Sequence, residues 1–359
     1  MKICLIADAI SVHTVRWAEY FAQQGDEVHL ITYESPIQDI SGVTIHAIRS
    51  RFDSLYLAFI PRHLKIYSLV KRLKPDIVHA HFISKFGFHA AFLNFRPVVM
   101  SAWGDDILII PYWSKVLWYF TKKSLKRADK IYAVSDDIAQ KIIFDFGISA
   151  DHVEVIPFGV DSKLFSPNEK EWPHEKVQVL SNRNFYEVYN IETLLHAIPL
   201  VVEKYENINF IIKGTGPLES SLKQLAKDLN IEKFIDFVGW IEYKEMPKYL
   251  HKGDIYVSTA TSDGTPVSVL EAMACKKACI VTDVGGVKEW IEDGMNGILI
   301  PPRNPEILAE KILDLARFPD ERERLGNQAY KVIDERGDWY RIMSSVRLDY
   351  ENMVKEHEQ

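Results

Sequence analysis

Residues 262–274 read SDGTPVSVLEAMA, a turn of small residues that leads into a helical pattern. Thr265 is a preferred N-cap residue and Pro266 suits the first helical position, so the stretch predicts a helix that begins here. The N–H groups of Val267 and Ser268 then point out of the helix end, which carries partial positive charge. The pattern therefore predicts an anion site at the start of this helix.

Two carboxylates bracket the predicted helix start. Asp263 precedes it in the loop, and Glu271 lies four residues after Val267 and three after Ser268, on the same helix face. An anion cradle beside two hydrogen-bond-accepting carboxylates suits a sugar joined to a diphosphate, because phosphates take N–H groups and hydroxyls take carboxylates. The alternative is a capped core helix with an unrelated aspartate before it.

The composition bounds the class of protein. The chain has 359 residues, of which 47% are hydrophobic and 26% are charged, as in ordinary globular proteins, and this length favours two domains over one. The formal net charge of −7 argues against nucleic acid as a partner. Residues 1–164 are mildly basic and the rest is acidic, which indicates an anionic acceptor or a membrane surface for the N-terminal half.

The cysteines indicate a reducing compartment. Cys4, Cys275 and Cys279 are odd in number, and their spacing fits neither a disulfide framework nor a zinc site. No apolar run has the length of a signal-peptide core or a membrane span. We therefore expect a cytoplasmic protein, either free or peripheral at the inner face of the plasma membrane, without a metal ion.

Short apolar runs alternate with helical patterns along the whole chain, which predicts βαβ units and mostly parallel sheets. The predicted strands are 3–7, 27–32, 77–79, 98–101, 130–135, 177–180, 209–213, 235–238, 255–258, 278–282 and 297–300. The predicted helices are 13–24, 191–205, 218–229, 243–251, 267–275, 305–316 and 338–354.

The division between the two series lies near Pro157 and Gly159, which are turn signals, and the polar stretch 166–173 follows as a predicted linker. Two such α/β domains in tandem form a cleft, with the carboxyl ends of the strands as the ligand side. The apolar face of the last helix predicts that it returns to the N-terminal domain.

Candidate ligand-binding residues follow three strands of the C-terminal half. Arg183 stands where a guanidinium would grip a diphosphate, or it is an ordinary surface arginine. The run KGTGP at 213–217 contains Gly214, where the absence of a side chain allows either a close ligand or a tight connection. Trp240 either lines a base or fills core.

Together these segments resemble the GT-B glycosyltransferases of family 4 over nearly the whole chain. The family's E-x7-E motif corresponds to Asp263 and Glu271, with LEAMA at 270–274 intact. Further segments that resemble the family are 285–301 in the C-terminal half, 156–165 between the halves, and 76–81 and 128–135 in the N-terminal half.

The resemblance implies a GT-B fold, in which two Rossmann-like, doubly wound parallel-sheet domains face each other across a cleft. Residues 1–165, with a crossover helix at about 338–359, would form the acceptor-binding domain, and 166–337 the nucleotide-sugar-binding domain. The implied enzyme is a retaining, metal-independent glycosyltransferase of the hexosyltransferase class that needs no cofactor. Its donor would be a UDP-, GDP- or ADP-sugar and its acceptor a hydroxyl of a glycan or lipid-linked molecule, in cell-surface polysaccharide or glycolipid synthesis.

The same resemblance implies residue roles. Glu271 would bind the ribose hydroxyls, Asp263 the hydroxyls of the transferred sugar, and Arg183 the diphosphate together with the helix N–H groups. The predicted donor-binding residues are Arg183, Lys213, Gly214, Trp240, Asp263, Gly264, Thr265, Val267, Ser268 and Glu271. The predicted catalytic residues are Asp263, Arg183 and His13.

The chain departs from the family pattern at several of these positions. Asp263 is one methylene shorter than the usual Glu, and the Lys expected a few residues after Arg183 is missing, with Tyr189 near its place and Lys213 as a candidate substitute. Trp103 stands where the family has a His. His13 is the candidate for that lost imidazole, or it packs within its own helix.

The N-terminal half contains a basic, aromatic stretch at 113–127. Such a stretch is typical of an arm that lies in a membrane interface, and equally of a helix with core aromatics and solvated lysines. Two further functions stay open: a catalytically impaired sugar-nucleotide-binding protein and a GT-B sugar-nucleotide epimerase. A nicotinamide oxidoreductase is disfavoured because no G-x-G-x-x-G follows the first strand of either half.

Overall fold

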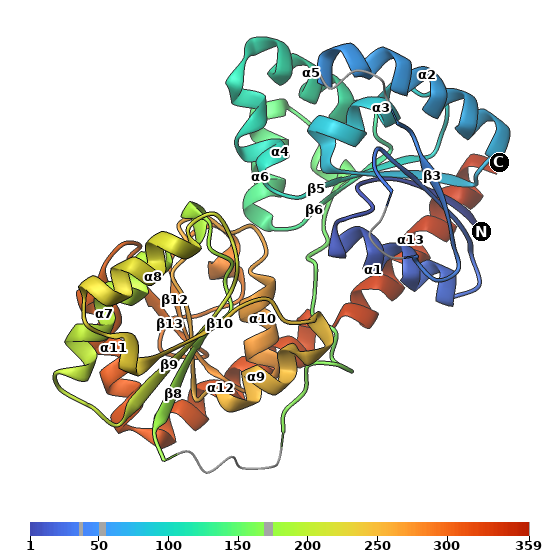
Figure 1. The fold of residues 1–359 in the computed structure, drawn as a ribbon. Helices are drawn as coiled ribbons and strands as arrows, with labels where there is room; N and C mark the ends of the chain where they lie inside the picture. Colours follow the sequence, from blue (N-terminus) through green and yellow to red (C-terminus); the bar gives the residue numbers. More distant parts are fainter. Residues whose placement is uncertain (36–38, 50–54, 169–174, 359) are drawn as a thin grey trace. The chain divides into compact units, whose positions relative to one another are not determined.

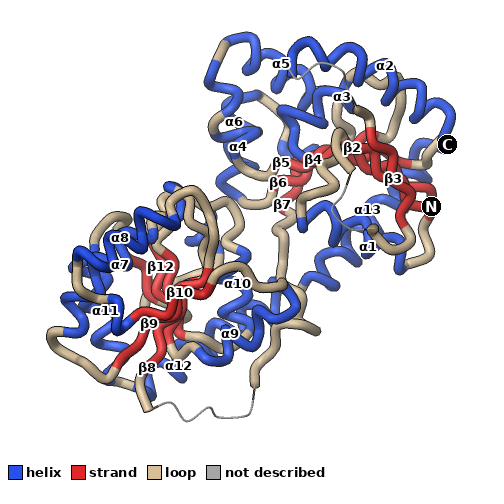
Figure 2. Tube along the Cα trace, viewed as in Figure 1, coloured by secondary structure: helices blue, strands red, loops and turns tan. Residues whose placement is uncertain are grey.

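A computed structural model describes residues 1–35, 39–49, 55–168 and 175–358 of the chain, which forms two compact units (Figure 1). The first unit consists of Met1–Pro157 and Met343–Gln359, and the second of Phe158–Ile342. Part of the predicted linker at 166–173 lies outside the described residues. Helices and strands alternate along both units (Figure 2), as the sequence predicts.

The first unit is a parallel sheet with helices. Its strands are β1 (Lys2–Ile6), β2 (Glu27–Thr32), β3 (Val43–Ala47), β4 (Ile77–His81), β5 (Val98–Ala102), β6 (Lys130–Ala133) and β7 (Val153–Val155). Its helices are α1 (Val12–Gln23), α2 (Leu55–Leu73), α3 (Phe88–Ala91), α4 (Asp105–Leu108), α5 (Lys115–Leu125), α6 (Asp136–Phe146) and the greater part of α13 (Trp339–Glu358).

The first sheet has the strand order β3-β2-β1-β4-β5-β6-β7, and every pairing is parallel. Sequential order reverses between β1 and β4, so this pair forms the topological switch point, where ligands bind at the carboxyl ends of such sheets. Both strands are buried along almost their whole length, which accounts for their continuous apolar runs.

The second unit repeats this plan. Its strands are β8 (Val177–Ser181), β9 (Ile208–Lys213), β10 (Ile235–Val238), β11 (Ile255–Ser258), β12 (Ala278–Thr282) and β13 (Ile298–Ile300), in the sheet order β10-β9-β8-β11-β12-β13. Its helices are α7 (Ile191–Val202), α8 (Glu219–Asp228), α9 (Met246–Lys252), α10 (Val267–Ala274), α11 (Pro305–Arg317) and α12 (Pro319–Val332). The switch point lies between β8 and β11.

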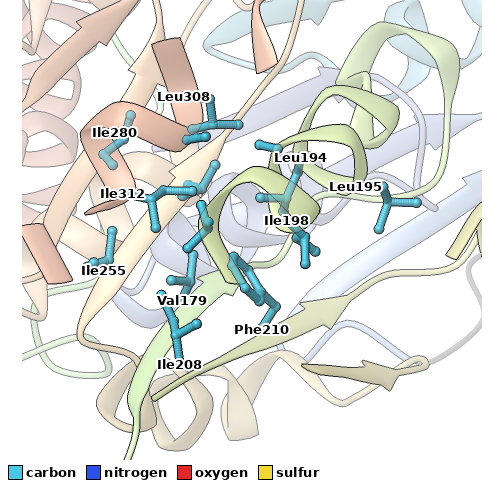
Figure 3. Packing of buried hydrophobic residues seen from close by; sticks show 14 of the residues in the cluster. Val179, Leu194, Leu195, Ile198, Ile208, Phe210, Ile255, Ile280, Leu308 and Ile312 are labelled. Atoms are coloured by element: carbon cyan, nitrogen blue, oxygen red, sulfur yellow. The ribbon is translucent and has the colours of Figure 1, made fainter. Parts of the chain in front are cut away.

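Buried aliphatic side chains join the second sheet to its helices (Figure 3). Leu194 and Ile198 of α7 and Ile312 of α11 belong to the same buried cluster as Val179 and Phe210 of the sheet. Each of these side chains is almost fully removed from water, and such burial contributes about 1.5–3 kcal/mol for a large aliphatic or aromatic residue. This packing makes the sheet a rigid base for the loops at its carboxyl edge.

The C-terminal helix α13 packs within the first unit through buried aromatic and polar contacts. The Tyr350 ring stacks on Phe21 of α1 with centroids 5.1 Å apart, and its hydroxyl hydrogen-bonds His79 Nδ1 at 2.5 Å. Tyr132 of β6 donates a hydrogen bond to Asp349. These contacts join α13 to the middle of β4 and to β6.

The prediction of two parallel α/β domains is confirmed, and eleven predicted strands match observed strands with differences only at their ends. The sequence reading missed the strands β3 and β7 and the helices α2, α3, α4, α6 and α12. Both missed strands lie at sheet edges and are only partly buried, so they lack the continuous apolar run of a central strand. Within the described ranges, no helix combines the length and apolar character that crossing a membrane requires.

A helical glycine provides a test of the packing around α12. A Cβ atom at Gly326 would lie 2.2 Å from the Lys276 carbonyl oxygen, so Gly326→Ala should lower the free energy of unfolding by about 1–3 kcal/mol. Without this contact, Ala in a helix would instead stabilise by about 0.5–1 kcal/mol. Gly239→Ala, where a Cβ meets nothing within 4 Å, is the control in urea denaturation. A more stable Gly326→Ala protein would contradict the packing.

Candidate functional site

Two of the predicted ligand-binding residues, Arg183 and Asp263, meet at the switch point of the second unit. Arg183 lies in the loop after β8, and Asp263 lies in the loop between β11 and α10. Because β8 and β11 are neighbours in the sheet, their carboxyl ends bring the two side chains together. The structure therefore joins residues that are 80 positions apart in the sequence.

Arg183 is the centre of this arrangement. Its Nη2 donates to Asp263 Oδ2 at 2.7 Å, and its Nη1 donates to Ser268 Oγ at 2.5 Å. Its guanidinium also lies over the Tyr189 ring, 4.2 Å from the centroid. Its Nε is buried and has no acceptor among the described residues. Because a guanidinium has five N–H groups and these two hydrogen bonds use only two of them, Arg183 retains donors for a ligand.

The Arg183–Asp263 ion pair is nearly buried, with 8% and 12% of the two side chains exposed. Burial opposes the charged form of Arg183, but the Asp263 carboxylate offsets this, so that the pKa of Arg183 is raised above its ordinary value. Removing one partner of such a pair leaves an uncompensated buried charge. The pair therefore holds the two loops in a fixed geometry.

Three glycines allow the loops at this edge to pack closely. A Cβ at Gly214 would lie 2.5 Å from the Arg183 carbonyl oxygen, and one at Gly216 would lie 2.5 Å from that of Phe185. Gly285 has φ +48°, and its Cβ would lie 2.2 Å from the Asp263 carbonyl oxygen. At Gly214 the structure thus shows the tight connection between neighbouring loops; contact of this residue with a donor stays a prediction.

The start of α10 differs from the sequence prediction. The helix begins at Val267, and Pro266 rather than Thr265 occupies the N-cap position, with no side-chain cap. The Val267 N–H is not free, because it donates to the Thr265 carbonyl oxygen at 2.8 Å in a tight turn that delays entry into the helix by one residue. The Ser268 N–H makes no recorded backbone hydrogen bond to any described residue.

Lys213 and Glu271 form the second part of the site. Lys213 ends β9 and is 9% exposed, and Glu271 on α10 is 4% exposed. Burial lowers the pKa of Lys213, and the charge of Glu271 acts in the opposite direction. The structure therefore places a buried cation close enough to Glu271 for their charges to interact.

The remaining predicted donor residues differ in their exposure to solvent. Thr265 is buried, Gly264 is half-buried, and Trp240 is 71% exposed in the loop after β10.

Sequence reasoning missed the residues that support Arg183. Tyr189, near the place of the family's lysine, provides the ring under the guanidinium. Asn182, directly after β8, accepts a hydrogen bond from the buried Tyr256 hydroxyl at 2.6 Å. Thr259 Oγ1 donates to the carbonyl oxygens of Tyr189 and Asn190 at 3.1 and 2.9 Å. Asn182 and Thr259 each directly follow a strand, and this position is the sequence feature that could have identified them as candidate site residues.

His13 lies in the first unit near the start of α1, and its ring meets Trp103 edge-to-face with centroids 5.9 Å apart. Trp103 also contacts the buried ring of His81, at the end of β4, at 5.1 Å. Burial lowers the pKa of both histidines to about 3. Both imidazoles are therefore neutral at pH 7.

Among the described residues, no group of three or more His, Cys, Asp or Glu side chains forms a potential metal site.

Two Rossmann-like units, the second with Arg183 bound to the start of a helix at its switch point, have the architecture of the GT-B class of glycosyltransferases. Residues 162–332 match the family model described as glycosyl transferases group 1, and residues 2–135 match that described as glycosyl transferase 4-like. The chain belongs to this family of glycosyltransferases, which confirms the resemblance found in the sequence.

Known relatives agree with this assignment. An uncharacterized glycosyltransferase of Methanocaldococcus jannaschii is 27% identical over 91% of this chain and 90% of its own length. The sulfoquinovosyl transferase of Arabidopsis thaliana is 25% identical over 91% of this chain and 67% of its own. Among solved structures, Anabaena HepE in complex with UDP shares the fold, with a TM-score of 0.83 and 17% identity over 98% of this chain and 100% of its own.

The Arg183–Asp263 pair provides a stability test. Asp263→Asn should lower the free energy of unfolding by about 3–5 kcal/mol, because Arg183 would keep a buried charge without its carboxylate. Asp263→Glu retains the charge and should cost clearly less. Urea denaturation of the full chain measures both changes. Equal losses for the two variants would mean that charge compensation is not what holds the loops together.

Acid should destabilise the first unit through its buried histidines. Because the pKa of His81 is about 3 in the folded chain and near 6.5 when unfolded, the unfolded state binds more protons between these values. Stability then falls as the pH drops below 6.5, by up to about 1.4 kcal/mol per pH unit for each such histidine. Asp106 has the opposite effect. Burial raises its pKa to about 6, so as the pH falls the folded state binds this proton before the unfolded state does, which stabilises the fold.

Urea denaturation between pH 7 and pH 4.5 measures this dependence. The His81→Gln variant should show a shallower decline in stability with falling pH than the parent protein. His152→Gln, at an exposed position of the same unit, should leave the slope as it is in the parent. A His81→Gln slope equal to that of the parent would show that this imidazole is not buried in its neutral form.

Proposed function

We propose that this glycosyltransferase moves a hexosyl-type sugar from a nucleotide-diphosphate sugar to a hydroxyl of a glycan or lipid-linked acceptor, with retention of anomeric configuration. The pathway would be the synthesis of a cell-surface polysaccharide or glycolipid. The observation that carries the proposal is Arg183, held by Asp263 and by Ser268 at the start of α10 with its Nε unpaired among the described residues. That arrangement suits a diphosphate.

The donor would be recognised by chemically distinct parts of the site. The diphosphate would take N–H donors of Arg183 that Asp263 and Ser268 leave unused, together with the Ser268 N–H, where the dipole of α10 favours negative charge. Glu271 would accept hydrogen bonds from the ribose hydroxyls, and the buried Lys213 would balance part of the donor's charge. Asp263 would bind hydroxyls of the transferred sugar, and Trp240 would frame the base.

The chemistry would rest on positioning and on stabilising the leaving group. The acceptor oxygen would attack the anomeric carbon from the face that the diphosphate leaves, and a departing phosphate oxygen would take the acceptor's proton. Arg183 and the helix dipole would stabilise the charge that develops on the diphosphate, so neither a metal ion nor a cofactor would be required. His13, neutral at pH 7, would offer substrate a hydrogen bond rather than a charge.

The names of relatives support this reading. HepE has been solved with UDP and with UDP-glucose, which makes a uridine donor the first to test among the UDP-, GDP- and ADP-sugars. The sulfoquinovosyl transferase is named for the sugar group that it transfers. A putative teichuronic acid biosynthesis glycosyltransferase of Bacillus subtilis, 25% identical over 79% of this chain, is named for the synthesis of teichuronic acid.

A donor panel tests the proposal. One class of UDP-, GDP- or ADP-sugar should raise the melting temperature of the parent protein, by linkage of binding to folding. Glu271→Gln should abolish turnover and most of the shift, because the ribose would lose a charged acceptor. Glu310→Gln, an exposed change in the same unit, should retain both. A full shift for Glu271→Gln would contradict its role, and no shift for any sugar nucleotide would contradict the donor class.

A catalytically impaired sugar-nucleotide-binding protein is the second candidate. It is favoured by two departures: Asp263 replaces the usual Glu, and Tyr189 lies where the family has a lysine, although Lys213 supplies a buried cation nearby. Donor binding without hydrolysis, and without transfer to any acceptor extract, would select this alternative over the transferase. We found no observation that favours an epimerase.

We further propose that the surface around α5 contacts an anionic membrane. Trp113, Val116 and Tyr119 are between 57% and 70% exposed, and Lys123 lies 6.0 Å from the centroid of the Tyr119 ring. Trp118 differs, because it stacks on Phe146 of α6 with centroids 5.7 Å apart. The stretch 113–127 thus divides into packed aromatics and an exposed apolar and basic face, which suits a membrane interface.

Vesicle flotation tests this contact. The parent protein should float with vesicles that contain phosphatidylglycerol, and the triple variant Lys122→Glu, Lys123→Glu, Lys126→Glu should lose most of that binding at low salt. The control carries the same charge change on exposed lysines of the second unit, Lys223→Glu, Lys227→Glu, Lys233→Glu. Equal binding of the two triple variants, or no binding of the parent, would exclude this surface as the contact.

A further inference from the structure

A cluster of cations and aromatic rings lies at the switch point of the first sheet, and none of the roles given above uses it. Asp8 follows β1 and Lys85 lies in the segment after β4, so this pair spans the two strands between which the strand order reverses. Lys85 Nζ lies 3.3 Å from Asp8 Oδ2, with about a third of each side chain exposed. In such folds this edge is where ligands bind.

Tyr33, just after β2, connects Lys85 to a second cation. The Arg62 guanidinium of α2 lies 4.1 Å from the centroid of the Tyr33 ring, and Lys85 Nζ lies 5.2 Å from it. The Tyr33 hydroxyl hydrogen-bonds His89 Nε2 at 2.6 Å. One buried tyrosine thus holds two cations and a histidine in one place, drawn from three different segments of the unit (α2 and α3 in Figure 1).

The cluster carries more cationic than anionic groups. Asp8 pairs with Lys85, but Arg62 has no carboxylate partner among the described residues. Three ring or guanidinium nitrogens are also buried without a hydrogen bond acceptor or donor in the described part of the chain: Arg62 Nε, His63 Nδ1 and His89 Nδ1. Buried polar groups are ordinarily satisfied, so unpaired nitrogens beside an excess positive charge indicate a place for an anion.

The backbone beside the cluster is strained. Phe82 has φ +67°, a conformation that is costly for a bulky residue, and it opens a π-helical turn over Phe82–Gly87 that contains Lys85. Single π-helical turns and positive φ angles in non-glycine residues concentrate at functional sites. Within this turn, Lys85 Nζ lies 5.2 Å from the centroid of the Tyr33 ring and 4.8 Å from that of Phe86.

We propose that Arg62, Lys85 and Tyr33 form a subsite for an anionic group of the acceptor, a phosphate or a carboxylate. This inference rests on the proposed function, since it names the chemistry of the acceptor in that reaction. Arg62 would bind the anion through its planar array of N–H donors, and Lys85 would add a point charge. The mildly basic character of residues 1–164 agrees with such an acceptor.

The test uses soluble probes and the full-length protein. Glycerol 1-phosphate represents a phosphate such as that of a lipid headgroup, glucuronate represents an acidic sugar, and glucose is the neutral control. Calorimetric titration at low ionic strength should detect at least one of the two anions binding to the parent protein and no binding of glucose. The anion that binds more tightly identifies the acceptor group.

Variants locate the binding. Arg62→Gln and Lys85→Gln should each raise the dissociation constant of that anion at least tenfold, and Arg62→Lys should raise it less, because the charge remains. Arg72→Gln, an exposed change of the same kind on α2, should leave it within a factor of two. Far-UV circular dichroism and the melting temperature establish that each variant is folded.

Two outcomes would overturn the subsite: neither anion binds the parent protein, or Arg62→Gln and Lys85→Gln bind as tightly as Arg72→Gln. Binding of sugar nucleotides is measured on the same variants and separates this inference from the proposed function. Stabilisation by a sugar nucleotide together with either negative result would refute the anionic subsite alone. Anion binding that depends on Arg62, without any response to sugar nucleotides, would support the subsite and refute the donor class.

Discussion

The buried ion pair of Arg183 and Asp263 is the constraint on which the candidate donor site depends. It joins two loops from neighbouring strands at the switch point of the second sheet, where about 10% of each side chain remains exposed. The loops can approach only because Gly214 and Gly285 lack the Cβ atoms that would collide with the backbone carrying the pair. Ser268 extends the same network to the start of α10, so an anion bound there would meet groups already in position.

Both units place polar and charged residues at the switch point of their sheet, but the chemistry of these residues differs between the units. Each has its strand order reversed beside its first strand, and each gathers polar and charged residues at the carboxyl edge of that point. In the second unit the residues are an arginine, two carboxylates and a lysine, which suit a sugar diphosphate. In the first unit they are Arg62 and Lys85 around Tyr33, whose hydroxyl hydrogen-bonds the buried, neutral His89.

Continuous apolar runs and positions at strand ends were sufficient to predict the central strands and part of the candidate site. The central strands, the pairing of Asp263 with the helix that contains Glu271, and the position of Arg183 after a strand all follow from local pattern. Contacts between distant segments could not be read in this way. Tyr189 under Arg183 and Lys213 near Glu271 arise from the order of strands in the sheet, and Pro266 displaced Thr265 as N-cap because a tight turn precedes the helix.

A crystal structure with the sugar nucleotide that stabilises the protein most would test the central claim directly. The account predicts a diphosphate within hydrogen-bonding distance of the Arg183 guanidinium and the Ser268 N–H, and ribose hydroxyls on Glu271. A nucleotide bound elsewhere, with Arg183 contacting only Asp263 and Ser268 as it does without ligand, would contradict it.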